Sequence, residues 1–172
     1  MSKKLKILIF PDPKLRTVAK KVDKFDKSLK NLSEDMLFTM YDANGIGLAA
    51  TQVDKHIRLV VMDLSEERNE PMVFVNPEYN VSKDHNLIEF EEGCLSIPNQ
   101  YGEVERPSEV VVRWIDREGN ENKRGFDGLW ATCIQHEIDH LDGKLFIDYL
   151  SPLRRQLITR KMKKFKRENS LI

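Results

Sequence analysis

The chain has 172 residues, of which 40% are hydrophobic and 33% are charged, and its 28 basic residues balance 28 acidic ones. Such a composition is typical of one soluble globular domain that is long enough to bury a core. It excludes a membrane helix, because no apolar run approaches the roughly 18 residues that one needs. The apolar run before Pro11 is also too short for the roughly 7–15 residue core of a signal peptide, so we expect a cytoplasmic protein.

Hydrophobic patterning predicts the following elements in chain order. Strands or extended segments are expected at 5–10, 57–64, 72–75, 86–91 and 109–115, and helices at 27–43, at 128–142 and after Pro152. Residues 117–121 form the hairpin turn that leads into a further short strand. Strands that cluster between helices, without strict alternation of the two, predict an α+β fold with largely antiparallel sheets.

Charge is unevenly placed along this chain. Residues 151–172 hold eight basic residues and one acidic residue, whereas residues 1–150 hold 20 basic and 27 acidic ones. The basic segment predicts an acidic or phosphate-bearing partner. It also predicts a helix that covers the core of the same domain with its apolar positions, which are Leu153, Leu157, Ile158 and Met162.

The stretch QHEIDH at 135–140 carries the strongest chemical signal. His136 and His140 are four residues apart, so on a helix both imidazoles lie on one face and can bind one metal ion. Glu137 is rotated by about 100° from His136, a position that suits a general base acting on metal-bound water. Two surface histidines without a function are the alternative for so short a motif.

A catalytic metal needs a third protein ligand and an open position for water. The metzincin pattern is not met, because Phe146 stands where its third histidine would be, and Glu168, the only downstream glutamate, lies in the basic tail. Cys133 is three residues before His136 but seven before His140, so its short side chain would strain to share one metal with both, and it is more simply a buried residue of the helix face. Cys94 remains a candidate ligand, although a lone cysteine is also a common core residue. Without an export signal we expect both thiols to be reduced.

The segment GIGLAATQ at 45–52 also fits a dinucleotide fingerprint in part. That fingerprint follows a strand and opens a helix, whereas this segment follows a predicted helix, so we expect no nucleotide. Two close glycines otherwise permit a sharp bend or a close approach to a ligand. Gln52 then offers an uncharged amide that can donate to a developing oxyanion, and a surface glutamine after a turn is the alternative.

Three segments stand together in this order: GIGLAATQ at 45–52, EGCLS at 92–96 and QHEIDHLDG at 135–143. They resemble the GxGLAAxQ, EGCLS and QHExDHLxG motifs of the peptide deformylase family, and PDPKLR at 11–16 is similar to that family's opening. The resemblance spans nearly the whole chain. The EGCLS form and the predicted helical tail are similar to the bacterial-type branch of the family. The resemblance implies antiparallel sheets packed around a central H-E-x-x-H helix, with a C-terminal helix.

The resemblance implies an enzyme that removes the formyl group from the N-terminal formyl-methionine of nascent polypeptides and releases formate. The implied metal ligands are Cys94, His136 and His140, with water or hydroxide in the fourth position. Fe(II) is the native metal of the family, and zinc, nickel or cobalt can occupy the site in prepared protein. Thiolate and imidazole ligands are compatible with all four metals.

The implied mechanism assigns a role to each remaining motif residue. Metal-bound water attacks the formyl carbon, and Glu137 takes its proton and delivers it to the departing amine. The Gln52 amide and the Leu95 backbone N–H stabilise the charge that builds on the formyl oxygen. Substrate contacts are expected from Gly45, Ile46, Gly47, Glu92, Cys133 and Ile134, with Ile46 and Gly47 binding the peptide like an added strand.

One position departs from the pattern of the family. Some bacterial-type members carry an arginine shortly after EGCLSIPxQ, where this chain has Tyr101, which puts an arginine contact to substrate at this edge in doubt. We expect residues 1–150 to form the catalytic domain and 151–172 to add a basic helix to it, with ribosomal RNA near the exit tunnel as its implied partner. An H-E-x-x-H metalloprotease and a ribosome-associated binding protein with a structural metal are the competing hypotheses.

Overall fold

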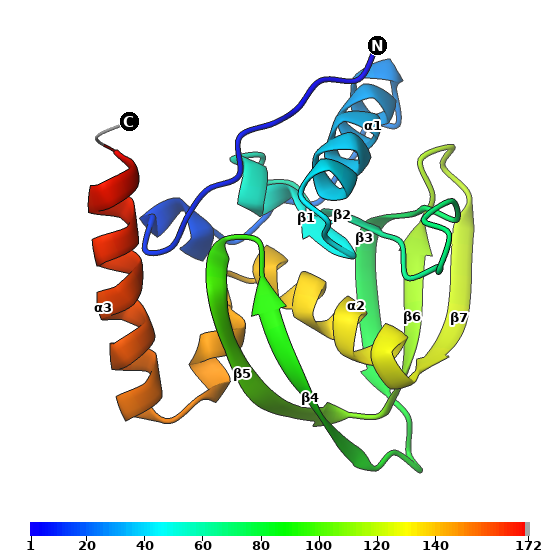
Figure 1. Ribbon diagram of the computed structural model, residues 1–172. Coiled ribbons are helices and arrows are strands. Elements are labelled where there is room, and N and C mark those ends of the chain that lie inside the picture. Colours follow the sequence, from blue (N-terminus) through cyan, green and yellow to red (C-terminus); the bar gives the residue numbers. More distant parts are fainter. Residues whose placement is uncertain (171–172) are drawn as a thin grey trace.

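A helix lies between two antiparallel sheets of unequal size in the computed structural model, which describes residues 1–170 (Figure 1). The elements in this part of the chain are α1 (Lys27–Asp42), β1 (Gly47–Ala49), β2 (Leu59–Met62), β3 (Met72–Val81), β4 (Leu87–Cys94), β5 (Ile97–Pro107), β6 (Glu109–Ile115), β7 (Glu121–Asp127), α2 (Gly128–Leu141) and α3 (Pro152–Asn169). Short 3-10 helices span Pro13–Arg16, Ala50–Val53 and Phe146–Tyr149. The predicted α+β class with largely antiparallel sheets is confirmed.

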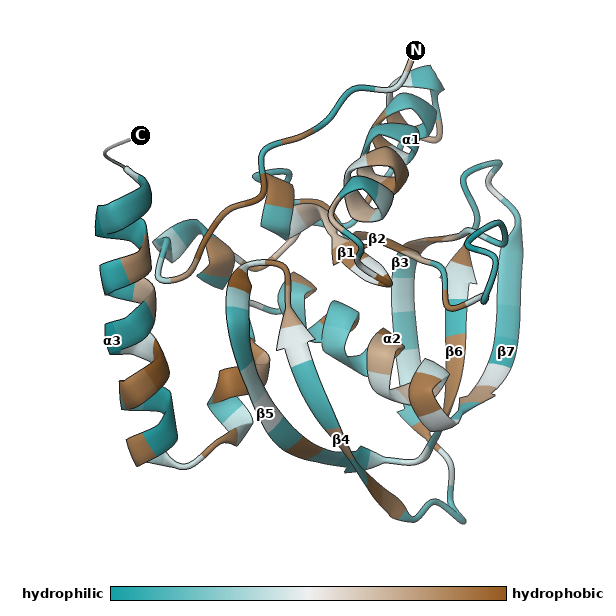
Figure 2. Ribbon diagram, in the orientation of Figure 1, coloured by the Kyte–Doolittle hydropathy of each residue, from teal (hydrophilic) through white to brown (hydrophobic). Residues whose placement is uncertain are grey.

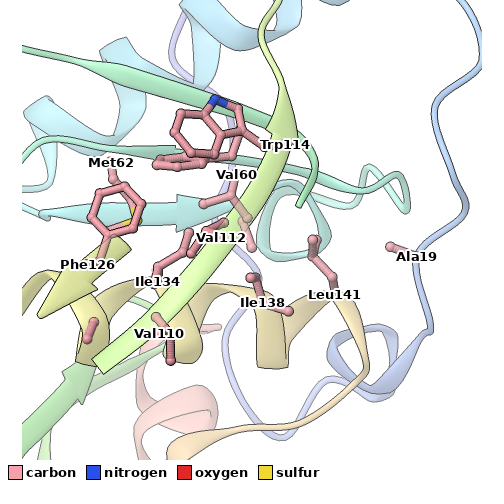
Figure 3. Close-up of a cluster of buried hydrophobic side chains, with 13 residues drawn as sticks. Ala19, Val60, Met62, Val110, Val112, Trp114, Phe126, Ile134, Ile138 and Leu141 are labelled. Atoms are coloured by element: carbon pink, nitrogen blue, oxygen red, sulfur yellow. The ribbon is translucent and has the colours of Figure 1, made fainter. Parts of the chain in front are cut away.

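The larger sheet has the order β1-β2-β3-β6-β7 and packs one face against α2. Its inward positions and the apolar side of α2 form a core cluster that includes Phe74, Trp114 and Phe126 (Figure 3). The ring centroids of Phe74 and Trp114 lie 4.8 Å apart, in a tilted contact of the kind that aromatic pairs prefer. This core fixes the position of α2 and therefore of the histidines that it carries.

The smaller sheet is the long, curved pair of β4 and β5, which lies on the other side of α2 (Figure 1). The register runs from Leu87 opposite Pro107 to Gly93 opposite Tyr101, and it shifts at Cys94, which pairs with Ile97. Leu95 and Ser96 form the turn at this point. The turn of the hairpin therefore brings the EGCLS segment next to α2.

The N-terminal segment joins the two motif-bearing loops. The Leu8 N–H donates to the Gln52 carbonyl at 2.7 Å, and the Phe10 N–H donates to the Ser96 carbonyl at 2.8 Å. Residues 5–10, predicted to be a strand or an extended segment, form no strand of either sheet. They hold the Gln52 and Ser96 backbones in fixed positions beside each other.

The basic helix α3 packs on the molecule with only part of its predicted apolar side. Ile158 and Met162 are buried, whereas Leu153 and Leu157 are exposed, because the buried stripe of α3 runs along positions 158 and 162. Figure 2 shows mainly hydrophilic residues toward the C-terminal end of α3 and hydrophobic ones in its N-terminal half. The last two residues of the predicted tail, 171–172, lie outside the described part. None of the helices in residues 1–170 is both long and apolar enough to cross a membrane.

Most predicted elements lie close to their expected positions. The helices expected at 27–43 and 128–142 are α1 and α2, and the strand expected at 109–115 is β6. The strand expected at 72–75 continues to Val81, and β5 was not predicted. Strand β5 is rich in polar residues because one of its faces is exposed, so its apolar signal is weak.

Candidate active site

Three ligand-type side chains meet where β4 ends against α2. Cys94 Sγ lies 3.4 Å from His140 Nε2, and the two Nε2 atoms of His136 and His140 lie 3.2 Å apart. All three atoms lie within 4.8 Å of one another, and both histidines are buried. Two imidazoles and one thiol that converge in this way fit a divalent transition metal. Sequence spacing alone did not decide whether Cys94 joins the two histidines, and in the structure it is the third member of the group.

Cys133 has a different environment from Cys94. Its thiol is partly buried beside the cleft, and it does not belong to the convergent group of possible ligands. Burial, with the charge of Glu137 adding to it, raises the pKa of the Cys133 thiol to about 12. A thiol that stays protonated makes a poor metal ligand, which agrees with the spacing argument.

A buried ionic network orients His136 from behind. His136 Nδ1 lies 2.9 Å from Glu92 Oε1. Arg106 donates two hydrogen bonds to the same carboxylate, from Nε at 2.7 Å and from Nη2 at 3.0 Å. Arg106 also donates to Asp139 at 2.9 Å, and the Tyr149 hydroxyl donates to the same Asp139 oxygen at 2.8 Å. With Nδ1 occupied by a carboxylate, the Nε2 lone pair of His136 points away toward the ligand cluster.

The charges in this network compensate each other. Burial favours the neutral form of Glu92, but hydrogen bonds from His136 and Arg106 outweigh burial and lower the pKa of Glu92. Burial also lowers the pKa of His140 well below its ordinary value, so its imidazole stays neutral and able to bind a metal.

Sequence patterning did not single out Arg106, Asp139 or Tyr149. The alternation of side chains along a strand could have identified Arg106. Glu103 and Glu105 are exposed, whereas Arg106 lies with Val104 on the buried face of β5. A charged residue on the inward face of a strand indicates a paired partner. The partners of Arg106 lie 14 and 33 residues away, which no local pattern reveals.

Glu137 occupies the position that a general base would need. Its carboxylate is buried, with Oε1 3.7 Å from His136 Nε2, and Oε2 has no hydrogen-bond partner among the described residues. Burial raises the pKa of Glu137 to about 7, with the Glu92 charge adding to this effect and His136 opposing it. A carboxylate with this environment can accept and return a proton near neutral pH.

Gln52 is held with its amide nitrogen toward Cys94. Its Oε1 accepts from the Ala49 N–H at 3.0 Å, and its Nε2 donates to Cys94 Sγ at 3.4 Å and to Ser96 Oγ at 3.1 Å. Gln52 is buried, so it is not a surface residue of a turn. Leu95, in the turn after Cys94, lines the same cavity as Gln52. Ser96 is a further polar contact that sequence patterning did not identify.

A cavity of about 510 Å³ opens beside these groups. Its lining includes Cys133 and predicted residues from all three motifs, namely Gly45, Ile46, Gly47, Gln52, Glu92, Cys94, Leu95, His136 and Glu137. Tyr101, Leu129 and Thr132 were not predicted as contacts but line it too. Ile134 corrects the expectation: it is fully buried in the core cluster with Ile138 and Leu141, because its side of α2 faces the larger sheet.

The geometry also bears on the protease alternatives. Phe146, at the position of the metzincin histidine, is buried, and its ring stacks on that of His136 with centroids 6.3 Å apart. Glu168 lies on the exposed side of α3, 3.9 Å from Lys164. Neither residue belongs to the group that could hold a metal ion, whereas Cys94 does.

Comparison with known proteins gives a consistent result. The polypeptide deformylase family model matches residues 4–156. A peptide deformylase of Stutzerimonas stutzeri is 53% identical over 166 residues, which cover 96% of this chain and 98% of the relative. A crystal structure of a peptide deformylase from Legionella pneumophila superposes with a TM-score of 0.91 at 50% identity, covering 97% of this chain and 98% of the other. One from Ehrlichia chaffeensis, solved with actinonin, gives a TM-score of 0.91 at 38% identity, with 97% and 99% covered. The chain therefore belongs to the polypeptide deformylase family.

Proposed function

We propose that this chain hydrolyses the formyl group from the N-terminal formyl-methionine of nascent polypeptides and releases formate. The observation that carries the proposal is the convergence of Cys94, His136 and His140 within 4.8 Å beside buried Glu137, at the wall of a cavity. Family membership supports the same reaction, since the relatives are named peptide deformylases.

The proposed metal ligands are Cys94, His136 and His140. A divalent metal bound by them would supply Lewis-acid chemistry and make water nucleophilic at neutral pH. By family resemblance the native metal is Fe(II), and zinc, nickel or cobalt are compatible with the same donor set. The ionic network behind His136 keeps its Nε2 directed to the ligand cluster and keeps the imidazole in one tautomer.

Glu137 is the proposed general base and acid. It takes a proton from the attacking water and returns it to the nitrogen of the departing amine. Its burial supports this role, because the raised pKa lets the carboxylate accept a proton near neutral pH, which an ordinary carboxylate does only weakly, and still return it. No described residue forms a hydrogen bond with Oε2, which leaves that oxygen available for the water.

Gln52 and Leu95 are the proposed donors to the formyl oxygen. The Ala49 N–H fixes the Gln52 amide so that its Nε2 faces the Cys94 side of the cavity. Together with the Leu95 backbone N–H it can stabilise negative charge as the formyl carbon becomes tetrahedral. Loss of one such donor typically costs about 3–4 kcal/mol of barrier.

The cavity suits a small acyl group and an apolar first side chain. Gly47 lies against Glu137, where a Cβ would come within 3.0 Å of its Cγ and Cδ, so space near the proposed base is tight. A formyl group carries only hydrogen beyond its carbonyl and therefore fits where an acetyl methyl group would not. Cys133, Thr132 and Ile46 are the proposed pocket for the methionine side chain, and Ile46 and Gly47 the proposed backbone contacts.

The proposed setting is the cytoplasm, where formylated nascent chains are the substrate partner. Residues 1–150 hold all the proposed site residues, and α3 is the proposed contact to ribosomal RNA. Contact through the basic side chains of α3 predicts a ribosome affinity that falls steeply as salt increases. An affinity that does not change with salt would argue against it.

Formate release tests the reaction directly. A formyl-methionyl peptide is compared with the same peptide carrying an acetyl group and with unformylated peptides that contain only internal bonds. We expect formate in step with free amine from the first substrate, and no reaction with the others. Cleavage of internal bonds without formate would instead favour the metalloprotease hypothesis.

A further inference from the structure

The loop between β2 and β3, residues 63–71, is closed by the buried carboxylate of its first residue. Asp63 is fully buried, and its Oδ1 accepts from the Ser65 N–H at 2.8 Å and from the Ser65 hydroxyl at 2.6 Å. Its Oδ2 accepts from the Glu70 N–H at 3.1 Å and from the Tyr41 hydroxyl at 2.5 Å. Both ends of the loop are therefore attached to one group, and through Tyr41 to α1.

Arg68 connects this loop to the glycine-rich segment. Its guanidinium donates through Nη2 to the Gly45 carbonyl and through Nη1 to the Asp63 carbonyl at 3.3 Å. It also lies over the Tyr41 ring, with Cζ 5.2 Å from the ring centroid. The Asp63 N–H in turn donates to the Ile46 carbonyl at 2.9 Å. The carbonyls of two successive residues, 45 and 46, thus accept hydrogen bonds from the Arg68 guanidinium and the Asp63 N–H.

The segment held in this way is a wall of the cavity. Gly45, Ile46 and Gly47 line it, and a Cβ at Gly45 would lie 2.7 Å from Leu95 Cδ1, as one at Gly47 would approach Glu137. Two of these three residues have no side chain that could anchor them by packing. Their backbone hydrogen bonds therefore decide where the wall lies, and glycine has more freedom to move than any other residue when they are lost.

We propose that Arg68 is a positioning residue for substrate binding, which acts through the Gly45 carbonyl without touching the reacting atoms. This proposal rests on the proposed function. The wall contacts the peptide in the bound state and in the transition state alike, so loosening it weakens both equally. Loss of such uniform binding raises KM and leaves kcat nearly unchanged. A bidentate guanidinium fits this role better than a lysine, which offers one compact charge.

The test compares Arg68→Ala, Arg68→Lys and the control Arg113→Ala in the metal-loaded enzyme. Arg113 is exposed on β6, and its side chain forms no hydrogen bond or ion pair with any described residue. For deformylation of a formyl-methionyl peptide, we expect Arg68→Ala to raise KM roughly tenfold, the effect of losing one charged hydrogen bond. The value of kcat should stay within about twofold, and Arg68→Lys should recover part of the KM.

A second readout separates positioning from general damage. Amide hydrogen exchange at residues 45–47 should be faster in Arg68→Ala than in Arg113→Ala, with thermal midpoints recorded for both. A KM equal to that of the control, or a fall in kcat at unchanged KM, would overturn the proposal. If Arg68→Ala does not fold, Arg68→Lys decides by the same criteria. Absence of formate release by the unmodified enzyme would instead refute the proposed function.

Discussion

Two walls of the cleft are built in contrasting ways. Helix α2 supplies His136, Glu137 and His140 as buried side chains, and a network of full charges holds one of them from behind. The segment 45–47 supplies mainly backbone, and hydrogen bonds to its carbonyls hold it from outside. Groups that perform chemistry need a fixed charge environment, whereas a surface that binds a peptide backbone needs fixed N–H and C=O groups.

Disruption of the buried ionic network behind His136 should have the largest effect on stability. Arg106→Leu leaves Glu92 and Asp139 buried without their shared cation, and removal of one partner from a buried network typically costs about 3–5 kcal/mol. Denaturant unfolding measures this loss. Metal affinity, measured by chelator competition, should fall roughly 10–100-fold, because Glu92, which orients His136, loses the cation that fixes its carboxylate. Arg113→Leu is the exposed control, with a change within about 0.5 kcal/mol. Equal losses in the two variants would contradict the role of the network.

Substitutions in the segment 45–47 should have a smaller effect, which is expected in catalytic activity. In Gly47→Ala the new Cβ meets Glu137 Cγ and Cδ at 3.0 Å, so the proposed base must shift, and kcat should fall roughly tenfold or more. Gly45→Ala should be milder, because its closest contact is the end of the flexible Leu95 side chain. Gly125→Ala, with nothing within 4 Å of the added Cβ, is the control. Steady-state kinetics would oppose this account if Gly125→Ala lost as much activity as Gly47→Ala.

The outer face of the β4–β5 pair gives the smallest effect. Glu89 lies opposite Glu105 and Glu91 opposite Glu103, all exposed, and like charges at such positions destabilise a sheet. A hydrogen bond with Glu103 and its nearby charge raise the pKa of Glu89. Folding therefore favours protonated Glu89, and this repulsion costs stability as pH rises through that pKa.

Glu103→Lys should remove this repulsion. We expect a small increase in thermal midpoint at pH 7, which disappears in acid where the glutamates are neutral in both proteins. Lys123→Glu, an exposed change on β7, serves as a control for altered net charge. A gain from Glu103→Lys that persists unchanged in acid would show that charge repulsion is not its cause.

The sequence predicted the residues that meet in the candidate site better than it predicted the residues that support them. A helical pair such as His136 and His140 can be recognised because its geometry follows from one local period. Cys94 required the resemblance to a family, since nothing local joins it to residues 42 and 46 positions away. Arg106 was missed because its partners are brought to it by the pairing of β4 and β5 and by the packing of α2.

Faces of helices were predicted less well than the helices themselves. Ile134 was expected in the substrate pocket with Cys133, but one residue of rotation places it in the core beneath the sheet. Leu153 and Leu157 were expected to be covered and are exposed, because the neighbouring surface meets α3 along Ile158 and Met162. Which side of a helix is buried depends on elements elsewhere in the chain, which a local apolar pattern does not contain.

The most direct test of the proposed function measures metal content and formate release together in the unmodified enzyme and in Glu137→Ala. We predict one equivalent of metal bound in both, because Cys94, His136 and His140 remain, and formate from a formyl-methionyl peptide only in the unmodified enzyme. Turnover by Glu137→Ala at the unmodified rate, or loss of metal from that variant with activity retained, would contradict the account.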